Sequence, residues 1–538
     1  MDSTLEIDKF LEPLAIDAQI LSGLSCEMAS TFAKLSAEST DMFLPTPISD
    51  SILAPEVSAG KGGSDGGRGE GNALFLGECN KQVGSGRELH KTWKDPGLTF
   101  LSGGTNLRVG FIELQHKLVI GDFGVPSVSR KLNRLLEHSW PIVDSLKNEN
   151  STSLFSWIGN RIAHVVRKGC DAFSLSPDQE LPLGVTFSFP MQQTSLSEAK
   201  LMAMGKGFAI TSDLDLGGHL TTGYEKHKSA DMPGIKIAAI ANDSVSTLVS
   251  FIYQFPAKTH QKAVMGVIVG TGCNATIPLK LSSLHESKRP ASINVLPGQD
   301  VAAAKIAVNT EWSINGSAPP LRKFGLINKW DEELDKAGEI PGFQPLEYMT
   351  AGRYLGELGR IMFLDYYATV LKQSTEKLPG KFRQKFGLTT TFLSHYHHNS
   401  PNGSMADQLN NEFPAEHPEF EWTKSLETVL FKIAVAIQKR AAGIIAASTV
   451  GLLMCAEEIP KPGTVGKKGV TELVVGYTGG CIQHFQDYLA DTQAYLDKIL
   501  SLEFGGEAPI RVVLHPCHDG GITGAGVLVP AALASRRT

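Results

Sequence analysis

One short segment could place a carboxylate for acid–base chemistry. Asn242 and Asp243 follow the apolar run 235–241 and precede a stretch with helical spacing. Ligands of α/β proteins usually bind at the carboxyl ends of strands, and a carboxylate there can act as a general base toward a bound hydroxyl. An Asp before a helix can equally serve as its cap. The segment alone leaves both interpretations open.

Two glycine turns could cradle phosphate. Gly103, Gly104, Thr105 and Asn106 form the first, and residues 270–272 (Gly-Thr-Gly) form the second. Glycine permits the torsions and the close approach that let backbone N–H groups converge on an anion. Either turn alone is more typical of an ordinary β-hairpin. The sequence has no GxxxxGK[ST] motif, which excludes a P-loop, and no GxGxxG after a strand.

A dispersed set of polar side chains is suited to a polyol, because sugar hydroxyls need paired donors and acceptors in a concave site. Its members are Ser188, Lys206, Asn274, Glu311 and Glu347. Each of them alone is more typical of a solvated surface. Their interpretation therefore depends on the other motifs.

Two histidine-rich segments could indicate a metal. They comprise His395, His397 and His398 in one segment, and His515, Cys517, His518 and Asp519 in the other. The first lacks cysteine and the second falls in a glycine-rich turn. Tetrahedral zinc sites usually pair ligands two to four residues apart in two clusters, so zinc is disfavoured.

Strands and helices interleave along the chain. Nearly continuous apolar runs predict buried strands at 183–189, 235–241 and 263–269, and a short strand at 73–78. Helical spacing occurs in these segments: up to about residue 45, 132–147, 153–168, 347–367 and 426–456. The alternation predicts an α/β fold in both halves of the chain.

Length and composition indicate an ordinary globular protein. The 538 residues suggest two domains, and 42% hydrophobic and 20% charged residues are typical of soluble proteins. A net charge of -6 gives no basic field for nucleic acid. Seven cysteines without a CxxC pair fit a reducing compartment.

Neither of two candidate targeting segments indicates export or membrane insertion. The start, MDSTLEIDKF, resembles neither a signal nor a transit peptide. The apolar run 441–456 is shorter than the roughly 20 residues that a membrane span needs, so we expect a buried helix there. We expect a cytoplasmic protein that does not bind a membrane.

Four motifs in a fixed order resemble the hexokinase family of ATP-dependent sugar kinases, particularly its divergent fungal members. They are SGGTNLRV (102–109), PLGVTFSFPMQQTS (182–195), IANDSVSTL (240–248) and VIVGTGCNA (267–275). NTEW (309–312) and LEYMTAGRYLGELGR (346–360) add to the likeness. The resemblance implies a two-domain actin-like (ribonuclease H-like) sugar-kinase fold with a deep interdomain cleft.

On this resemblance we expect three segments. Residues 1–72 would form an N-terminal helix and flexible loop. Residues 73–234 would form a small α/β domain, and residues 235–538 a large α/β domain whose last helix returns toward the small one.

The resemblance also implies a role for each motif residue. Asp243 would be the base for the 6-hydroxyl of a hexose, with Lys206 beside it. The hexose would be held by Ser188, Lys206, Asn242, Asn274, Glu311 and Glu347. ATP would contact Gly103, Gly104, Thr105, Asn106, Thr271, Gly272, Gly479 and Gly480. Mg²⁺ would accompany the nucleotide, with no separate metal site on the protein.

The chain departs from the family pattern near the nucleotide. The first turn of the family reads D-[LIF]-G-G-T-N, and Leu101 and Ser102 stand before the glycines here. The apolar segment ALFLGE (73–78) would reach the turn with Glu78 at the Asp position if Cys79–Leu101 were absent. This spacing predicts an insertion or a retained intron at 79–101. Gly205 and Thr478 replace a Thr and an Asp of the family pattern.

Two functions follow from the resemblance. The first is ATP-dependent phosphorylation of a hexose, with glucose expected, at the 6-hydroxyl as the first step of glycolysis. The alternative is a weak or inactive sugar-sensing regulator that acts through protein partners and enters the nucleus. Both leave monomer and homodimer open.

Overall fold

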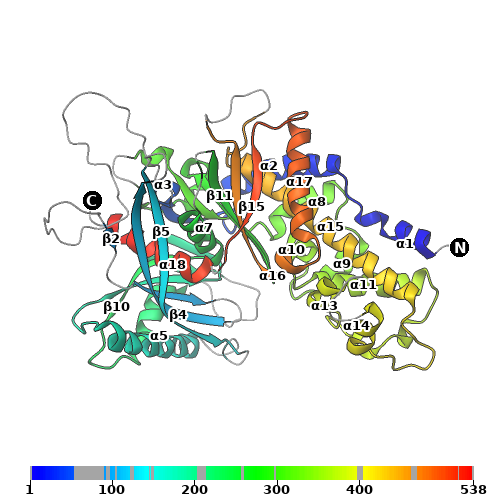
Figure 1. Cartoon of the computed structure of the whole chain (residues 1–538), viewed down its shortest axis with the longest axis horizontal. Coiled ribbons are helices and arrows are strands. Elements are labelled where there is room, and N and C mark those ends of the chain that lie inside the picture. Colours follow the sequence, from blue (N-terminus) through cyan, green and yellow to red (C-terminus); the bar gives the residue numbers. More distant parts are fainter. Residues whose placement is uncertain are drawn as a thin grey trace.

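The computed structural model consists of two α/β halves side by side along its long axis (Figure 1). It describes residues 3–53, 90–92, 97–102, 106–120, 126–143, 146, 151–202, 214–255, 258, 260–295, 299–396, 404–461, 469–518 and 520–535. Each half is organised around its own sheet. We call them the large half and the small half.

The large half contains a six-stranded sheet in the order β1-β13-β12-β11-β14-β15. The strands are β1 (Leu44–Ser49), β11 (Gln261–Val269), β12 (Cys273–Lys280), β13 (Lys305–Asn309), β14 (Glu472–Thr478) and β15 (Arg511–Pro516). β11 and β12 form an antiparallel hairpin, whereas β14 lies parallel to β11 on the other side. The carboxyl ends of β11 and β14 therefore meet at one edge.

The small half contains a sheet in the order β10-β6-β3-β4-β2, with β5 paired to β4. Its strands are β2 (His90–Thr92), β3 (Gly97–Ser102), β4 (Asn106–Ile120), β5 (Pro126–Pro141), β6 (Leu181–Phe187) and β10 (Ile235–Ala241). A separate three-stranded sheet comprises β7 (Met191–Ser195), β8 (Glu198–Leu201) and β9 (Leu214–Asp215). β10, β6 and β3 are mutually parallel.

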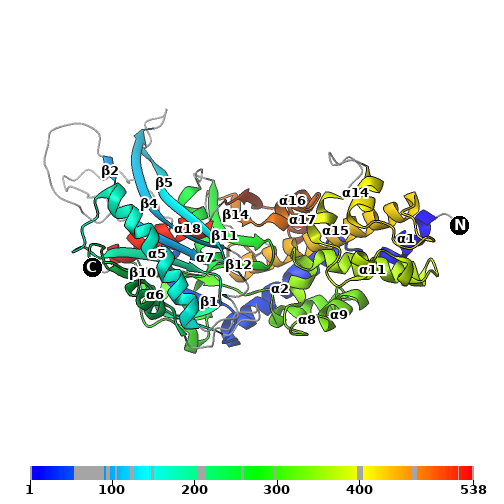
Figure 2. The same ribbon diagram turned by 90° about the horizontal axis from the view of Figure 1, so that it is seen from below.

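Most of the described helices belong to the large half and extend it away from the small sheet (Figure 2). They are α1 (Ser3–Leu11), α2 (Ala18–Glu38), α8 (Ala318–Lys323), α9 (Lys329–Lys336), α10 (Pro345–Thr350), α11 (Leu355–Thr369), α12 (Gly380–Arg383), α13 (Thr390–His395), α14 (Met405–Glu412), α15 (Lys424–Cys455), α16 (Gly480–His484) and α17 (Tyr488–Glu503). The small half has α5 (Ser151–Phe173) and α6 (Leu216–Glu225), and α3 (Asp50–Leu53) follows β1.

Two helices lie between the sheets. α7 (Asp243–Gln254) packs against β11 and β12 of the large sheet, and α18 (Gly520–Ser535) packs against β3, β6 and β10 of the small sheet. The two helices also pack against each other. Their apolar side chains form a core of their own, separate from the cores of the large and small halves.

Glycines allow this middle layer to be thin. A Cβ on Gly524 of α18 would lie 2.0 Å from the carbonyl oxygen of Ser246 in α7. A Cβ on Gly184 of β6 would lie 2.2 Å from the carbonyl oxygen of Ala525. Any side chain at either position would therefore push the sheets apart.

The predicted strands at 183–189, 235–241 and 263–269 are confirmed as β6, β10 and β11. The apolar run 441–456 lies in α15 and is buried against α2 and α17, as expected for a core helix. Among the described helices, none combines the length and apolar character that crossing a membrane requires.

The helix expected at 132–147 is wrong. Residues 126–141 form β5, which pairs antiparallel with β4 from Asn106↔Pro141 to Ile120↔Pro126, with one register shift between Phe111 and Ile112. Hydrogen bonding to a neighbouring strand outweighs a local helical pattern, because the pattern reflects only which side chains are apolar. The helix expected over 347–367 is interrupted at residues 351–354, which separate α10 from α11.

The strand that enters the first glycine turn is also not the expected one. β3 (Gly97–Ser102) runs into the turn and pairs with both β4 and β6. Residues 97–101 therefore belong to the sheet, and the predicted insertion at 79–101 is wrong in that part. The expected strand at 73–78 lies outside the described residues. Leu101 and Ser102 thus truly occupy the positions before the glycines.

The chain also divides between the halves differently from the expected boundaries. β10 pairs with β6 in the small sheet, so the small half extends past residue 235. At the N-terminus, β1 pairs with β13 and α2 packs on α15, so residues before 54 belong to the large half. The last helix, α18, does return to the small sheet.

A buried carboxylate joins the end of α15 to the large sheet. Glu458 accepts from Lys262 of β11 at 2.7 Å and from Lys305 of β13 at 2.6 Å. Burial raises the pKa of Glu458, but the two ammonium groups outweigh burial and lower it to about 2.

We expect Glu458→Gln to lower the free energy of unfolding by about 2 kcal/mol, because both lysines lose their charged partner. Since the folded-state pKa lies below the unfolded value, wild-type stability should be full above about pH 4.3 and fall as the pH drops toward 2. Urea unfolding between pH 7 and 3 measures both effects.

Glu457→Gln is the matched control, because that side chain is 67% exposed and its pair with Lys280 is solvated. It should change stability by under about 0.5 kcal/mol. Equal losses in the two variants would contradict the role given to Glu458.

Candidate active site

The parallel strands of the small sheet bring three of the predicted segments to one edge. Ala241 of β10 pairs with Thr186 of β6, and Ser102 of β3 pairs with Phe187 of β6. Asn242, Ser188 and the first glycine turn follow these three strand ends directly. The sheet therefore collects residues that are far apart in the sequence.

Asn242 and Asp243 form the junction between β10 and α7. Asn242 is buried and caps the helix: its Oδ1 accepts from the N–H of Ser244 at 2.9 Å. Asp243 is half-buried, and its Oδ1 also lies 2.9 Å from that nitrogen. The N-cap of the helix is therefore Asn242, not Asp243. Asp243 contacts the start of the helix through one of its two carboxylate oxygens. The Asn242 amide donates to the carbonyl oxygen of Phe189 at 3.1 Å and ties the sugar-loop motif to the junction.

A buried network crosses from this junction to the large sheet. The hydroxyl of Ser244 lies 2.8 Å from Asn242 Oδ1 and 3.2 Å from Asn309 Oδ1, and it accepts from Thr276 Oγ1 at 2.7 Å. Asn274 Nδ2 donates to the same Asn309 oxygen at 2.9 Å. Two of the predicted hexose ligands, Asn242 and Asn274, are therefore joined through two side chains.

Glu311 adopts a strained backbone conformation at this site. Its φ is 49°, in the left-handed region that costs a non-glycine residue roughly 1–2 kcal/mol. Its carboxylate accepts from Asn309 Nδ2 at 2.7 Å, and its N–H points at Asn309 Oδ1 at 3.4 Å. Strain held in place by surrounding contacts is typical of functional positions.

Glu347 lies in the first turn of α10 and is 5% exposed. Its Oε2 accepts from the N–H of Cys273 at 3.0 Å, at the end of the 270–272 turn. A Cβ on Gly272 would lie 2.9 Å from this oxygen, so any larger residue would require the Glu347 carboxylate to shift. The hexose-ligand candidate Glu347 and the phosphate-turn candidate Gly272 are therefore in direct contact.

The glycine turn at residues 270–272 packs against a further glycine pair, Gly479 and Gly480, directly after β14. Gly479 has a φ of 119°, and a Cβ on it would lie 2.3 Å from the carbonyl oxygen of Val269. The N–H of Gly352 donates to the carbonyl oxygen of Gly270 at 2.7 Å and so supports the 270–272 turn. Thr271 is exposed. Within the described part of the chain, the N–H groups of Thr271 and Gly272 have no backbone acceptor.

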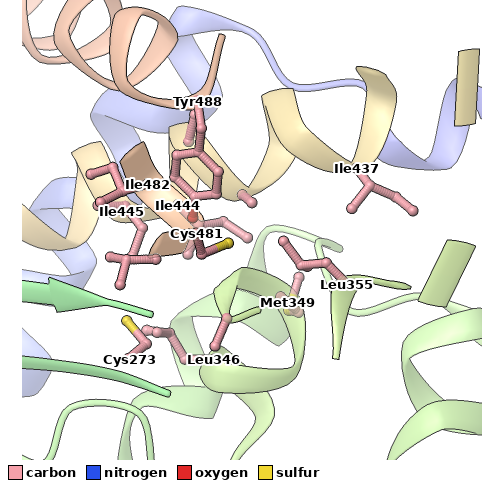
Figure 3. Close-up of a cluster of buried hydrophobic side chains, with 14 of the residues drawn as sticks. Cys273, Leu346, Met349, Leu355, Ile437, Ile444, Ile445, Cys481, Ile482 and Tyr488 are labelled. Atoms are coloured by element: carbon pink, nitrogen blue, oxygen red, sulfur yellow. The ribbon is translucent and has the colours of Figure 1, made fainter. Parts of the chain in front are cut away.

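An apolar cluster fixes these turns to α10 and α15 (Figure 3). Cys273 follows one turn and Cys481 follows the other, while Leu346 and Met349 of α10 lie against them. Burial raises the pKa of each thiol to about 12, so both cysteines are protonated at neutral pH and serve as core side chains. The Cys273 thiol accepts from Trp312 Nε1 at 3.2 Å.

Several predicted residues cannot be placed. Gly103, Gly104, Thr105 and Lys206 lie outside the described residues. Asn106 begins β4 and is exposed. Ser188 is half-buried directly after β6, beside the carbonyl that Asn242 contacts.

Asn309 and Ser244 are among the network members that sequence reasoning overlooked. Both stand inside recognised motifs, NTEW and ANDSV. An amide two residues before the motif carboxylate Glu311 was a usable signal for Asn309. The bond from Ser244 to Asn309 spans 65 residues of sequence, and no local pattern reveals it.

The histidine segments make local contacts. His395 Nδ1 lies 2.8 Å from the Thr391 carbonyl oxygen, and His515 Nδ1 lies 3.0 Å from that of Pro516. Among the described residues, no three His, Cys, Asp or Glu side chains form a group that could hold a metal ion. His397, His398 and Asp519 lie outside the described residues.

Fold and site together define a sugar kinase of the actin-like type. The full-length fold is similar to that of a hexokinase from Schistosoma mansoni, solved as a complex with glucose, with a TM-score of 0.68 and 20% identity over 98% of this chain and 100% of the other. Two family models, both described as hexokinase, match residues 98–253 and 264–531. The chain belongs to the hexokinase family.

Curated relatives come from plants and yeast. Hexokinase-1 of Nicotiana tabacum is 28% identical over 432 residues, covering 79% of this chain and 77% of the relative. Glucokinase-1 of Saccharomyces cerevisiae is 26% identical over 497 residues, covering 85% and 92%. These relationships support a hexose kinase function. The match beginning at residue 98 agrees with β3 as the strand that enters the first turn.

We expect Gly479→Ala to destabilise the protein by about 2 kcal/mol or more, because its Cβ would overlap the Val269 carbonyl and force β11 and β14 apart. Thermal unfolding measures this loss. Gly506→Ala is the matched control: its φ is also positive, at 147°, but no heavy atom lies within 4 Å of an added Cβ. Equal effects would show that backbone strain, not the contact between the turns, limits this position.

Proposed function

We propose that this protein transfers the γ-phosphoryl group of ATP to the 6-hydroxyl of a hexose, with glucose as the preferred substrate, in the first step of glycolysis. The observation that carries the proposal is the hydrogen-bonded network that joins Asn242 and Asp243 to Asn274 and Glu311. It links the half-buried Asp243, through Ser244, to three of the residues that would bind the hexose hydroxyls. The glucose complex of the Schistosoma mansoni relative supports the choice of sugar.

In this proposal Asp243 accepts the proton of the 6-hydroxyl as phosphorus is attacked. Its position at the first residue of α7 fixes the carboxylate, since its Oδ1 is held by the N–H of Ser244. The hexose would be oriented by Asn242, Asn274 and Glu311 together with Ser188 and Glu347. Orientation matters because a held hydroxyl reacts as in a unimolecular step and water is the competing nucleophile.

The nucleotide would lie along the glycine turns. The N–H groups of Thr271 and Gly272, without backbone acceptors among the described residues, fit an anion. Gly479 and Gly480 would contact the adenosine side, and Gly103, Gly104, Thr105 and Asn106 the phosphates from the small half. Lys206 would neutralise charge beside the hexose. Mg²⁺, bound with ATP, would supply charge neutralisation of the phosphates.

We expect Asp243→Asn to lower kcat for hexose phosphorylation by about 10²–10⁴-fold with little change in hexose affinity, because the amide cannot accept the proton. A coupled hexose 6-phosphate assay with ATP and Mg²⁺ measures the rate, and calorimetry measures the affinity. Asp178→Asn, at an exposed turn, is the control. Undiminished turnover in Asp243→Asn would reject Asp243 as the base.

The second candidate is a sugar-sensing regulator with weak or no catalysis. Leu101 and Ser102 favour it, because they end β3 where the family pattern has an Asp that helps to place the metal–nucleotide complex. Thr478, the last residue of β14, is a second departure on the nucleotide side.

The two candidates make different predictions for Leu101→Asp. If the protein is a kinase weakened at this turn, the substitution should raise kcat/KM for ATP by about tenfold through its contact with the metal–nucleotide complex. Steady-state kinetics at saturating hexose measure this change, with Leu135→Asp at an exposed position of β5 as the control. Hexose binding without turnover, in wild type and in Leu101→Asp alike, would favour the regulator.

A further inference from the structure

Asn309 contacts more of the candidate site segments than any residue selected from the sequence. It ends β13 and is 2% exposed. Its Oδ1 accepts from Asn274 and lies within hydrogen-bond distance of Ser244, and its Nδ2 donates to Glu311. No other side chain described above contacts all three segments.

We propose that Asn309 is a positioning residue that holds Glu311 and Asn274 for hexose binding and sets their place relative to Asn242 and Asp243. The inference rests on the proposed hexose function and deepens it by naming the group that orders the sugar ligands. Asn309 acts through its neighbours.

The hold on Glu311 has two parts. The N–H of Glu311 points at Asn309 Oδ1 at 3.4 Å, and its carboxylate accepts from Asn309 Nδ2 at 2.7 Å. Both contacts act on a residue whose φ of 49° is unfavourable for a side-chain-bearing residue. Loss of both contacts removes the support that Asn309 gives to this conformation and to the position of the carboxylate.

The chemistry of the position calls for an amide. Asn274 and Ser244 present donors to Asn309, whereas Glu311 presents an acceptor. An Asn side chain supplies one oxygen and two N–H groups, so it satisfies both kinds of partner at once. An Asp at this position would keep the acceptor for Asn274. It would also place a second carboxylate next to that of Glu311.

The contact with Ser244 extends this order to the catalytic segment. Ser244 lies in α7, directly after Asp243, and its hydroxyl also contacts Asn242 Oδ1. Asn274, Asn309 and Glu311 belong to the large half, whereas Asn242 follows a strand of the small sheet. Asn309 therefore links ligands that come from the two halves.

The test compares Asn309→Asp and Asn309→Ala with wild type. We expect both to raise the hexose KM and the calorimetric hexose Kd by about tenfold or more, with the ATP KM changed less than about twofold, because the ordered sugar ligands are lost. Asn309→Asp is nearly isosteric and remains informative if Asn309→Ala does not fold. Asn410→Asp, on the exposed face of α14, is the matched control.

A pH series separates positioning from general damage. The carboxylate that contacts residue 309 is that of Glu311; Asp243 contacts the N–H of Ser244 at the start of α7, and Glu347 of α10 contacts the N–H of Cys273, next to Asn274. In Asn309→Asp, two adjacent carboxylates share a proton more readily as the pH falls. Hexose affinity of that variant should therefore improve by about fivefold from pH 8 to 5.5, while wild type and Asn410→Asp change by less than about twofold.

The outcomes for this inference and for the proposed function are distinct. If wild type binds hexose and the Asn309 variants bind it equally well, the positioning role is overturned, whatever the rate of phosphoryl transfer. If wild type binds hexose without forming hexose 6-phosphate, the kinase proposal fails and the variants' Kd values still decide the role of Asn309. Wild type that neither binds nor phosphorylates hexose overturns both.

Discussion

The burial of α7 between two sheets is the constraint on which the site depends. Every residue of this helix from Ser244 to Tyr253 is buried, on one side against β11 and β12 and on the other against α18. Because Gly524 has no side chain, α18 packs directly against the α7 backbone, and the two-helix layer between the sheets is tightly packed. The helix start can move only if both sheets move. Asp243, its first residue, is therefore fixed at the start of α7, the helix that lies between the two halves (Figure 1).

Hydrogen bonds among buried polar side chains further restrict the geometry of the candidate site. Asn242, Ser244, Thr276 and Asn309 are each nearly inaccessible to water and satisfy one another's hydrogen bonds. An unpaired polar group in this setting costs about 1–3 kcal/mol, so the network favours one arrangement of its members. The proposed hexose ligands are thus ordered by a buried network whose members come from both halves.

The nucleotide side relies on close backbone contact. Gly479 lies against Val269 and Gly270, and Gly272 lies against Glu347, so hexose and phosphate candidates share a boundary at the 270–272 turn. The apolar cluster around Cys273 and Cys481 packs against these turns and supports them. The departures from the family pattern, Leu101 and Thr478, both fall at strand ends on this side. Under the proposed function, sugar binding and phosphoryl transfer would therefore rest on different residues and could diverge in this chain.

The sequence by itself determined the family, the strand–Asn–Asp–helix junction, the buried character of α15 and those candidate site residues that the structure brings together. These features are encoded locally, in apolar runs and in motifs whose residues are adjacent in the chain. It did not determine that residues 97–102 form the strand before the first turn, that residues 126–141 form a strand, or that Asn309 and Ser244 join the ligands. Only the tertiary structure decided those points. Strand pairing and buried hydrogen bonds connect segments distant in sequence, and their energies override the local periodicity on which a sequence pattern is judged.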